Sequence, residues 1–373
     1  MKIYLDNAAT TGIDPIVLEE MMPFLTSNFG NPSSIHEYGR KSRAAIEKSR
    51  KIIAQALNAS SAEIFFTSCG TESNNMILKQ AVEDLGVKRI ISSPIEHHCV
   101  LHSLETLARK GIEIKWLSVD NEGNIDMGEL EQLLKESSST LVTIMHANNE
   151  IGTIAPIDAI GKLCKQYDAY FHSDTVQTVA HYKIDLQATS VDFISGSAHK
   201  FHGPKGIGFV FIRSSAILKP YIHGGSQERN MRAGTENVAG IVGIGKAMEL
   251  WENNRTDYMN KIMSLKSYFA EKVKNEIPSA IINGKQGDKS LYHVLSIALP
   301  ENTKTDLLLF NLDIAGICAS GASACASGSL QASHVMEAIH APLDKRTVRF
   351  SFSKDNTIEE IDKTVEVLKT MVL

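Results

Sequence analysis

Short apolar runs alternate with amphipathic helical patterns along much of the sequence, and this alternation constrains the fold more than any other feature. The runs are rich in β-branched and aromatic residues, which favours strands at 64–67, 89–92, 114–119, 141–146, 170–172, 193–195 and 207–212. Between several of them apolar residues recur at helical spacing, as at Ile157, Ile160, Cys164 and Tyr167. Strands that alternate with helices predict an α/β fold with a mostly parallel sheet.

Two further segments join a capping pattern to an apolar stripe, which is typical of helix starts. The patterns are Asp126-x-x-Glu129 and Thr357-x-x-Glu360. The stripes that follow are Leu130, Leu133 and Leu134 in the first segment, and Ile358, Ile361, Val365 and Leu368 in the second.

The pattern changes near residue 250, where a charged helical segment (252–276) leads to shorter strands and an alternating run at 347–353. We therefore predict two domains. The large domain comprises residues 13–252. A smaller α+β domain comprises residues 1–12 and 253–373 and carries a mobile, small-residue loop at about 319–330.

Composition excludes several classes of protein. The net charge is −5 over 373 residues and no Lys/Arg run is present, so direct binding to nucleic acid is not expected. No apolar stretch approaches the roughly 20 residues of a membrane span, and the N-terminus has no apolar signal core. Five scattered cysteines, an odd number, indicate a reducing cytoplasm.

Small and polar residues follow most of the predicted strands. In an open α/β sheet, ligands bind at the carboxyl ends of the strands, so these loops are expected to form one site. The loops are SCGTESNN (68–75), PIEHH (94–98), ANNEIG (147–152), Ser173-Asp174 with Gln177, and GSAHK (196–200). They supply an anion-sized turn, an imidazole, amides, a carboxylate and an amine.

An amine, a carboxylate and an anion-binding turn together match the demands of one cofactor. Lys200 is the amine, Asp174 the carboxylate, and Gly70-Thr71 the turn at a helix start. Singly these residues are as well explained by a surface lysine, a turn residue and a helix cap at Thr71. Pyridoxal phosphate (PLP) needs a Schiff-base lysine, a carboxylate for its pyridine nitrogen and an anion site for its phosphate.

Motifs along nearly the whole chain then carry a specific resemblance. They are YLDNAATT (4–11), FGNPSSIH (29–36), FTSCGTESNN (66–75), EHH (96–98), MHANNEIG (145–152), HSDTVQ (172–177), SGSAHKFHGPKGIG (195–208), HGGSQERNMRAGTEN (223–237) and SGASACASGSL (320–330). In this order they resemble the NifS/IscS-like cysteine desulfurases, in the class V aminotransferase group of fold-type I PLP enzymes. The resemblance implies the fold of the fold-type I PLP enzymes, and it implies that the protein is a homodimer in the cytoplasm.

The resemblance also implies roles for single residues. Lys200 is similar to the Schiff-base lysine, Asp174 to the partner of the pyridine nitrogen, and His97 to the catalytic residue that stacks on the ring. Gln177 matches the group that bonds the ring oxygen. The residues that match phosphate ligands are Gly70, Thr71, Ser197 and His199.

Three further positions match family residues around the substrate and the second subunit. Thr235 resembles the residue that reaches the phosphate of the neighbouring subunit. Asn149 and Arg349 match residues near the cofactor and the substrate's carboxylate. Arg349 lies on the polar side of an alternating strand, where its guanidinium can clamp a carboxylate; a surface arginine is the alternative.

The five cysteines differ in their settings. Cys164 and Cys318 lie in apolar surroundings and are predicted core thiols, whereas Cys69 and Cys99 are explained by size alone or by proximity to a cofactor. Cys325 lies among serines, alanines and glycines that have little to anchor them, and it matches the family's persulfide-forming cysteine.

The reaction implied by the resemblance begins when L-cysteine displaces Lys200 from PLP and the released amine takes the Cα proton. The thiolate of Cys325 then attacks the substrate sulfur, alanine leaves, and a persulfide remains for transfer. The acceptor, such as an iron–sulfur scaffold protein or a thiolation pathway, is not determined by the sequence.

Other functions fit these residues less well. Zinc would have to use stretches whose spacings fit no common zinc pattern: His97-His98-Cys99, His172-x-Asp174 and His199-x-x-His202. Within PLP enzymes the alternatives are a selenocysteine lyase and an aminotransferase, of which the latter has no need for Cys325. A protein-binding scaffold is disfavoured because every cofactor position is filled.

Overall fold

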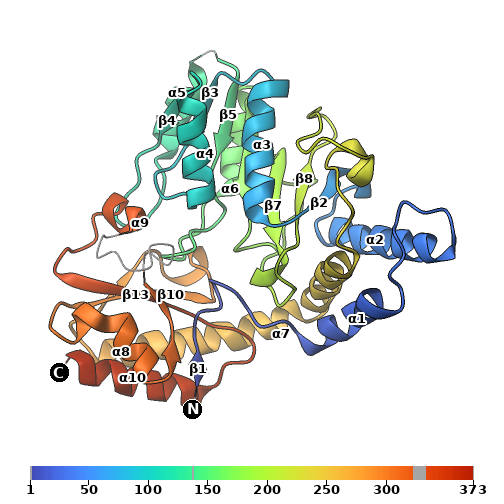
Figure 1. Cartoon of the computed structure of the whole chain (residues 1–373). Coiled ribbons are helices and arrows are strands. Elements are labelled where there is room, and N and C mark those ends of the chain that lie inside the picture. Colours follow the sequence, from blue (N-terminus) through green and yellow to red (C-terminus); the bar gives the residue numbers. More distant parts are fainter. Residues whose placement is uncertain (1, 137, 322–332, 373) are drawn as a thin grey trace.

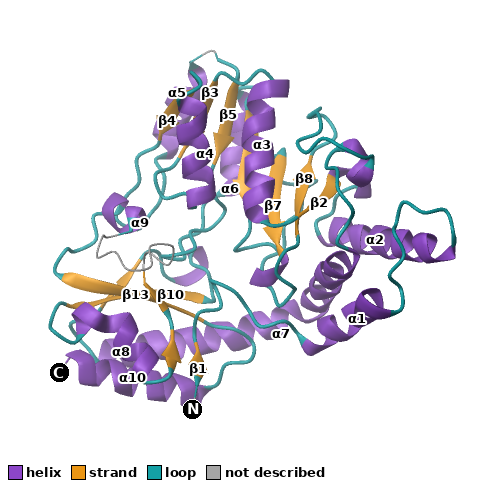
Figure 2. Ribbon diagram, in the orientation of Figure 1, coloured by secondary structure: helices purple, strands orange, loops and turns teal. Residues whose placement is uncertain are grey.

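The computed structural model describes residues 2–136, 138–321 and 333–372, and within them the strands form two principal sheets. Figure 1 shows the larger sheet above the smaller one, and Figure 2 shows helices around both. The strands of the larger sheet are β2 (Ile64–Thr67), β3 (Arg89–Ser92), β4 (Glu113–Trp116), β5 (Thr140–Thr143), β6 (Tyr170–Asp174), β7 (Phe193–Ser197) and β8 (Gly208–Ile212). A strand forms in each region where the sequence predicts one.

The larger sheet has the strand order β2-β8-β7-β6-β5-β3-β4. The pairs β3–β4, β3–β5, β5–β6 and β6–β7 are parallel. Among the described strands of this sheet only β8 runs the other way, antiparallel to both β2 and β7. The prediction of a mostly parallel sheet is therefore confirmed.

Helices cover both faces of this sheet. The helices are α3 (Gly70–Asp84), α4 (His98–Ala108), α5 (Met127–Lys135) and α6 (Ile157–Gln166). Leu141 packs in a buried cluster with residues of α3 and α4, whereas the next residue, Val142, packs in a cluster with residues of α5 and α6. Burial on both faces is why the strands are continuous apolar runs instead of alternating ones.

The two predicted capping patterns form, one of them in part. Asp126 caps α5 by accepting from the backbone N–H of Glu129, but the Glu129 carboxylate accepts from Ser118 instead of returning to Asp126. Thr357 and Glu360 exchange hydrogen bonds in both directions at the start of α10 (Ile358–Val372). Of the predicted α10 stripe, Ile358 is exposed, whereas the later members are buried.

The smaller sheet has the order β12-β13-β10-β9 and is antiparallel. Its strands are β9 (Ile281–Asn283), β10 (Val294–Pro300), β12 (Ser320–Gly321) and β13 (Lys345–Ser351), accompanied by α8 (Leu308–Ile314), α9 (His334–Ala338) and α10. Among the described residues, no helix combines the length and the apolar composition that a membrane span requires.

A single long helix, α7 (Val238–Glu276), connects the two parts. Its first half packs against α1 (Pro15–Thr26) and α2 (Glu37–Ala56), and α10 also packs against it (Figure 1). The predicted boundary between residues 252 and 253 falls inside α7, which continues across it. The division into two domains at this point stays a prediction.

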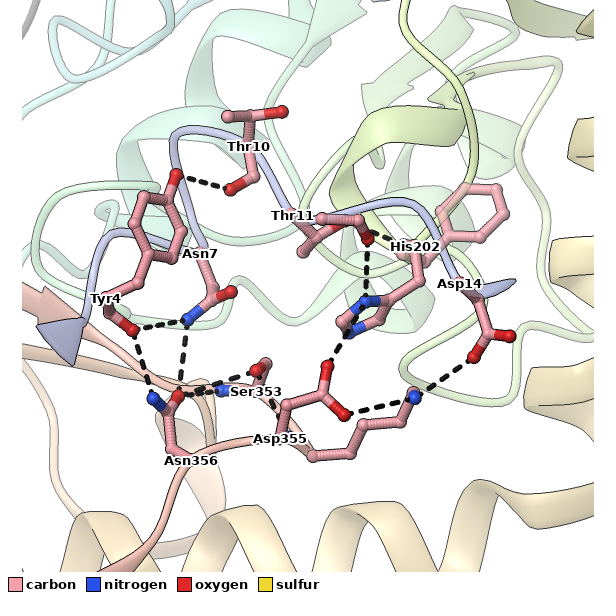
Figure 3. Close-up of polar contacts among 12 residues, drawn as sticks. Tyr4, Asn7, Thr10, Thr11, Asp14, His202, Ser353, Asp355 and Asn356 are labelled. Carbon is pink, nitrogen blue, oxygen red and sulfur yellow. Dashed lines mark hydrogen bonds and ion pairs between the residues drawn. The ribbon is translucent and has the colours of Figure 1, made fainter. Parts of the chain in front are cut away.

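The N-terminal segment, residues 3–14, joins both sheets. β1 (Ile3–Tyr4) pairs in parallel with β11 (Ile317–Cys318). Farther on, Asn7 Nδ2 donates to the Ser351 carbonyl oxygen (2.9 Å), whereas the N–H of Thr11 donates to the carbonyl oxygen of His199 (2.8 Å). Figure 3 shows this segment in contact with Asn356 through Tyr4 and Asn7, and with His202 through Thr11. The segment therefore contacts the small sheet and the Lys200 loop at once.

Candidate active site

A cavity of about 340 Å³ opens at the carboxyl edge of the larger sheet. The ends of β2, β3, β5 and β6 and the segments that follow them contribute Gly70, Thr71, His97, Asn149, Asp174 and Gln177 to its lining. The end of β7, the turn after it and β13 contribute Ser197, His199, Lys200 and Arg349. The structure thus brings these predicted site residues together, as the strand directions require.

Lys200 ends a 3₁₀ turn (Ala198–Lys200) that directly follows β7. Its Nζ donates to the carbonyl oxygens of Ala8 (2.7 Å) and Ala9 (2.9 Å). The N-terminal segment therefore holds the amine at the cavity wall.

Asp174 is the last residue of β6, and its carboxylate is buried. It accepts hydrogen bonds from Asn74 Nδ2 (2.6 Å), the backbone N–H of Val176 (2.9 Å) and Ser195 Oγ (3.4 Å). A carboxylate fixed in this way beside a cavity can bond a protonated ring nitrogen.

The start of α3 provides an anion site. The helix begins at Gly70 after Cys69, which within the described chain makes no side-chain capping bond, so the first N–H groups are available. Thr71 lies inside the helix, and the alternative that it acts as the cap is wrong. Ser197 Oγ, also in the cavity wall, is buried and has no hydrogen-bond partner among the described residues. This donor set fits a phosphate group.

His199 and Gln177 lie in the same wall. His199 Nδ1 is 3.2 Å from Thr10 Oγ1. Burial, with a smaller effect of the charges on Lys200 and Lys205, lowers the pKa of His199 to about 4, so the ring is neutral at neutral pH. Gln177 Nε2 donates to the carbonyl oxygen of Ala8 (3.0 Å), which fixes the amide in place.

His97 is the N-cap of α4, and its Nδ1 accepts from the backbone N–H of Cys99 (3.2 Å). Burial is the largest cause of a lowered pKa for His97; Asp174 opposes it and Lys200 adds to it. A neutral, half-buried imidazole in the cavity wall is suited to lie against an aromatic ring.

Arg349 is 3% exposed, so the alternative of a surface arginine is wrong. One guanidinium nitrogen donates to Asp6 Oδ1 (2.8 Å) and another to the carbonyl oxygen of Asn149 (3.0 Å). Its Nε is buried with no partner among the described residues. The two residues predicted to lie near a substrate carboxylate are therefore in contact.

Two predicted site residues are not brought into this cavity by the described chain. Thr235 is exposed in the segment before α7, outside the cavity lining. Cys325 lies outside the described residues, between Gly321 and Ser333. The roles of both stay predictions.

The other four cysteines are described. Cys164 is buried in the core, as predicted, whereas Cys318 in β11 is only partly buried. Cys69 and Cys99 both line the cavity. Burial raises the pKa of the Cys99 thiol to about 12, so it is protonated at neutral pH.

The histidines considered as zinc ligands do not converge on one metal site, and two of them bond to other groups. His172 is fully buried, with its Nδ1 2.8 Å from Thr143 Oγ1, and His202 Nδ1 is 3.0 Å from the carbonyl oxygen of Gly12. Within the described ranges no group of three or more His, Cys, Asp or Glu side chains has the arrangement of a metal site.

Several groups around the cavity were missed from the sequence. They are Asp6, the carbonyls of Ala8 and Ala9, and Asn74. Asn74 had a local signal, because it lies one helical turn after Gly70 and hence on the same face. The contacts of the N-terminal segment around the cavity had no such local signal, because they join residues 169 or more positions apart.

Glu96 was also assigned no role by the sequence. Its carboxyl group is fully buried and accepts from the backbone N–H of Met145 (2.8 Å) and from Ser93 Oγ (3.3 Å). Burial raises its pKa to about 8, so it carries a proton at neutral pH. Glu96 thus fastens the loop of His97, after β3, to the loop of Met145, after β5.

Replacing Glu96 by glutamine tests this assignment. The pKa of Glu96 is higher in the folded protein than in the unfolded chain, so between about pH 4.5 and 8 the folded protein binds more protons. The free energy of unfolding therefore falls as the pH rises through this range. The glutamine in Glu96→Gln cannot ionise. The free energy of unfolding of this variant, relative to that of the parent, should therefore rise by more than about 1 kcal/mol between pH 5 and pH 8.5. Urea unfolding at both pH values measures this gain.

Glu83→Gln, at an exposed position of α3, is the matched control. It should change neither the free energy of unfolding nor its pH dependence appreciably. Parallel pH curves for the parent and Glu96→Gln would contradict the raised pKa.

Comparison with known proteins gives consistent matches. The family described as Aminotransferase class-V matches residues 3–364. The chain is 45% identical to the cysteine desulfurase IscS of Dictyoglomus turgidum, over 100% of this chain and 94% of that protein.

Solved structures are similar over the whole chain as well. A NifS-like protein superposes with a TM-score of 0.92 at 38% identity, covering 100% of this chain and 99% of that one. A structure described as SspA in complex with cysteine has a TM-score of 0.80 at 32% identity, covering 96% and 100%. These similarities, with the mixed and mostly parallel sheet, confirm the predicted fold class.

Proposed function

Because the chain belongs to the aminotransferase class-V family, and within it to the cysteine desulfurases, we propose that it uses PLP in this cavity to convert L-cysteine to L-alanine. We further propose that the sulfur is captured on Cys325 and passed to an acceptor. One observation carries the assignment of the cavity: the Lys200 amine, the Asp174 carboxylate and the start of α3 all border it.

The residues present fit PLP. The first N–H groups of α3 and the Ser197 hydroxyl, which has no hydrogen-bond partner among the described residues, would hold the phosphate together with the side chains of Thr71 and His199. Asp174 would bond the pyridine nitrogen, Lys200 would hold the aldehyde carbon, and the ring would lie against His97. When bound, the cofactor withdraws electrons from the Cα atom of an amino acid attached to it.

Lys200 is proposed to move the proton at the substrate Cα. Its Nζ is held by two backbone carbonyls of the N-terminal segment, and these acceptors favour the protonated amine after it has taken the proton. Asp174, kept in position by Asn74 and Val176, would stabilise a protonated ring nitrogen of the bound cofactor.

The substrate's carboxylate is assigned to Arg349 and Asn149. Arg349 is buried beside the cavity and its Nε has no partner among the described residues, so it can donate to an added anion. A related solved structure, described as a complex with cysteine, supports L-cysteine as the substrate.

Cys325 is proposed as the sulfur acceptor within the chain. Its thiolate would attack the substrate sulfur as the C–S bond breaks. The electron pair of that bond would stay on the substrate carbon, which would take a proton, so that alanine leaves and a persulfide remains on Cys325. The protonated state of Cys99 supports this choice, since a thiol with a pKa of about 12 is a poor nucleophile.

We also propose a cytoplasmic homodimer that delivers sulfur to a separate acceptor or iron–sulfur scaffold protein. Exposed apolar side chains gather on α1, on the loop after it and at the start of α2: Ile16, Leu18, Met22, Leu25, Phe29 and Tyr38. A second copy of the chain would cover this face, and Thr235 would then reach the partner's phosphate site.

Lys200→Ala should lose covalent attachment of the cofactor, because no other amine borders the cavity among the described residues. Borohydride reduction followed by peptide mapping should place PLP on Lys200 in the parent and on no lysine in the variant. Lys205→Ala, at an exposed position of the same loop, is the control and should keep the attachment. Cofactor found on Lys205 or Lys162 would overturn the assignment.

Cys325→Ser should keep the cofactor's absorbance and its change on addition of cysteine, yet lose alanine and sulfide release by orders of magnitude. A hydroxyl cannot form a persulfide, and the substitution should cost well under ~1 kcal/mol of stability. The rate at which Cys325→Ser turns over selenocysteine as a substrate should fall less, because selenium leaves carbon more easily than sulfur does.

Cys318→Ser, in β11 and outside the cavity lining, is the control for Cys325 and should keep the parent rate. If Cys325→Ser desulfurates cysteine at the parent rate while Cys69→Ser or Cys99→Ser does not, the acceptor is one of those two thiols.

Sedimentation equilibrium should give twice the chain mass of 40.9 kDa. Phe29→Glu should shift the protein toward the monomer, because Phe29 is 73% exposed in the proposed interface. Phe310→Glu, at a 62% exposed phenylalanine on α8, is the matched control and should stay dimeric. A monomeric parent protein would contradict the proposal.

A further inference from the structure

A chain of three hydrogen bonds joins the Asp174 carboxylate to the His97 ring. Asn74 Nδ2 is 2.6 Å from Asp174 Oδ2 and 3.2 Å from Cys99 Sγ. Cys99 Sγ is in turn 3.0 Å from His97 Nδ1. All four residues line the cavity, and Asn74 is fully buried.

The direction of each bond in this chain is determined by chemistry. The Asp174 carboxylate can only accept, so the Asn74 amide must present its NH₂ group to it. The opposite amide orientation would set Asn74 Oδ1 against the carboxylate oxygen. One amide hydrogen therefore goes to Asp174 and the other to Cys99 Sγ.

The Cys99 thiol then has one hydrogen left to donate. Burial raises its pKa to about 12, so the hydrogen is present at neutral pH. Because Sγ accepts from Asn74, its own S–H is directed to His97 Nδ1. The backbone N–H of Cys99 donates to the same nitrogen at 3.2 Å. Nδ1 is thus an acceptor, and the ring proton of His97 lies on Nε2.

We propose that Asn74 and Cys99 are positioning residues that connect Asp174 to His97 and fix the His97 ring as the Nε2–H tautomer. In this role Cys99 is a hydrogen-bond relay and not a nucleophile. The inference rests on the proposed function only in that His97 and Asp174 are the residues assigned to the cofactor ring. The bonds themselves belong to the protein without cofactor.

The relay has two physical consequences. Two donors on Nδ1 stabilise the neutral imidazole, and they oppose rotation of the ring away from the orientation that faces the cavity. The charged and titratable groups that act on His97 are Asp174, which favours protonation, and Lys200, His98 and His102, which disfavour it. The relay therefore acts with Lys200 to keep His97 neutral beside the Asp174 carboxylate.

Substitutions at position 99 separate the relay from simple filling of space. Serine can still accept from Asn74 and donate to Nδ1, whereas alanine can do neither. Cys99→Ala leaves the backbone N–H in place, so it removes one of the two donors on Nδ1. The matched control is Cys69→Ala, because Cys69 lines the same cavity but its Sγ contacts Ser68 Oγ (3.6 Å) instead of Asn74 or His97.

The test is ¹⁵N NMR of the full-length protein labelled at histidine, recorded with and without added PLP. The His97 signals are assigned by their loss in His97→Gln. In the parent, His97 should be the Nε2–H tautomer in both samples. In Cys99→Ala the midpoint of its titration should rise by about 0.5 to 1 pH unit, the equivalent of one lost hydrogen bond, and the line widths should show ring motion. Cys99→Ser should restore the parent midpoint, and Cys69→Ala should leave it unchanged.

Observation of the Nδ1–H tautomer in the parent would overturn the proposal without any variant at position 99. An unchanged midpoint in Cys99→Ala, or a failure of Cys99→Ser to restore it, would also overturn it. These results are distinct from a failure of the proposed function, since the sample without PLP reports the relay whether or not the protein desulfurates cysteine.

Discussion

The common direction of β3, β5, β6 and β7 is the constraint on which the site depends. Parallel strands end at the same edge of a sheet, so the loops that follow them meet there although they are far apart in sequence. The reversed strand β8 begins at this edge, where its first residue, Gly208, lies close to Gly196 of β7 and to Cys69 before α3. A Cβ atom at Gly208 would lie 2.5 Å from the Gly196 carbonyl oxygen and 2.9 Å from Cys69 Cα, so glycine is needed where the start of α3 comes close to the Lys200 loop.

The N-terminal segment completes what the sheet begins. Its backbone carbonyls hold the Lys200 amine and the Gln177 amide, and its Asp6 carboxylate holds Arg349. Because the same segment pairs with β11 and with the end of β13, it sets Arg349 of the small sheet relative to the Lys200 amine of the large one. A segment without long regular structure thus determines the distance between the two halves of the cavity.

Burial sets the charges around the cavity. It keeps the His97 and His199 rings neutral, leaves Glu96 protonated and keeps the Cys99 thiol protonated. A buried neutral group can orient a neighbour by hydrogen bonding without adding a charge that would compete with the cofactor or the substrate.

Sequence patterns alone were enough to predict the strands, the class of fold and most of the cavity's side chains, including Lys200 and Asp174. Periodicity and turn chemistry are local, and the order of strands in an α/β sheet leaves few choices for where loops meet. Three features could be seen only in the folded chain: Arg349 is buried against Asp6, α7 continues across the predicted domain boundary, and Asn74 and Cys99 link Asp174 to His97. These features depend on distances between side chains from separate elements, and no local pattern encodes such distances, because folding the intervening chain is what creates them.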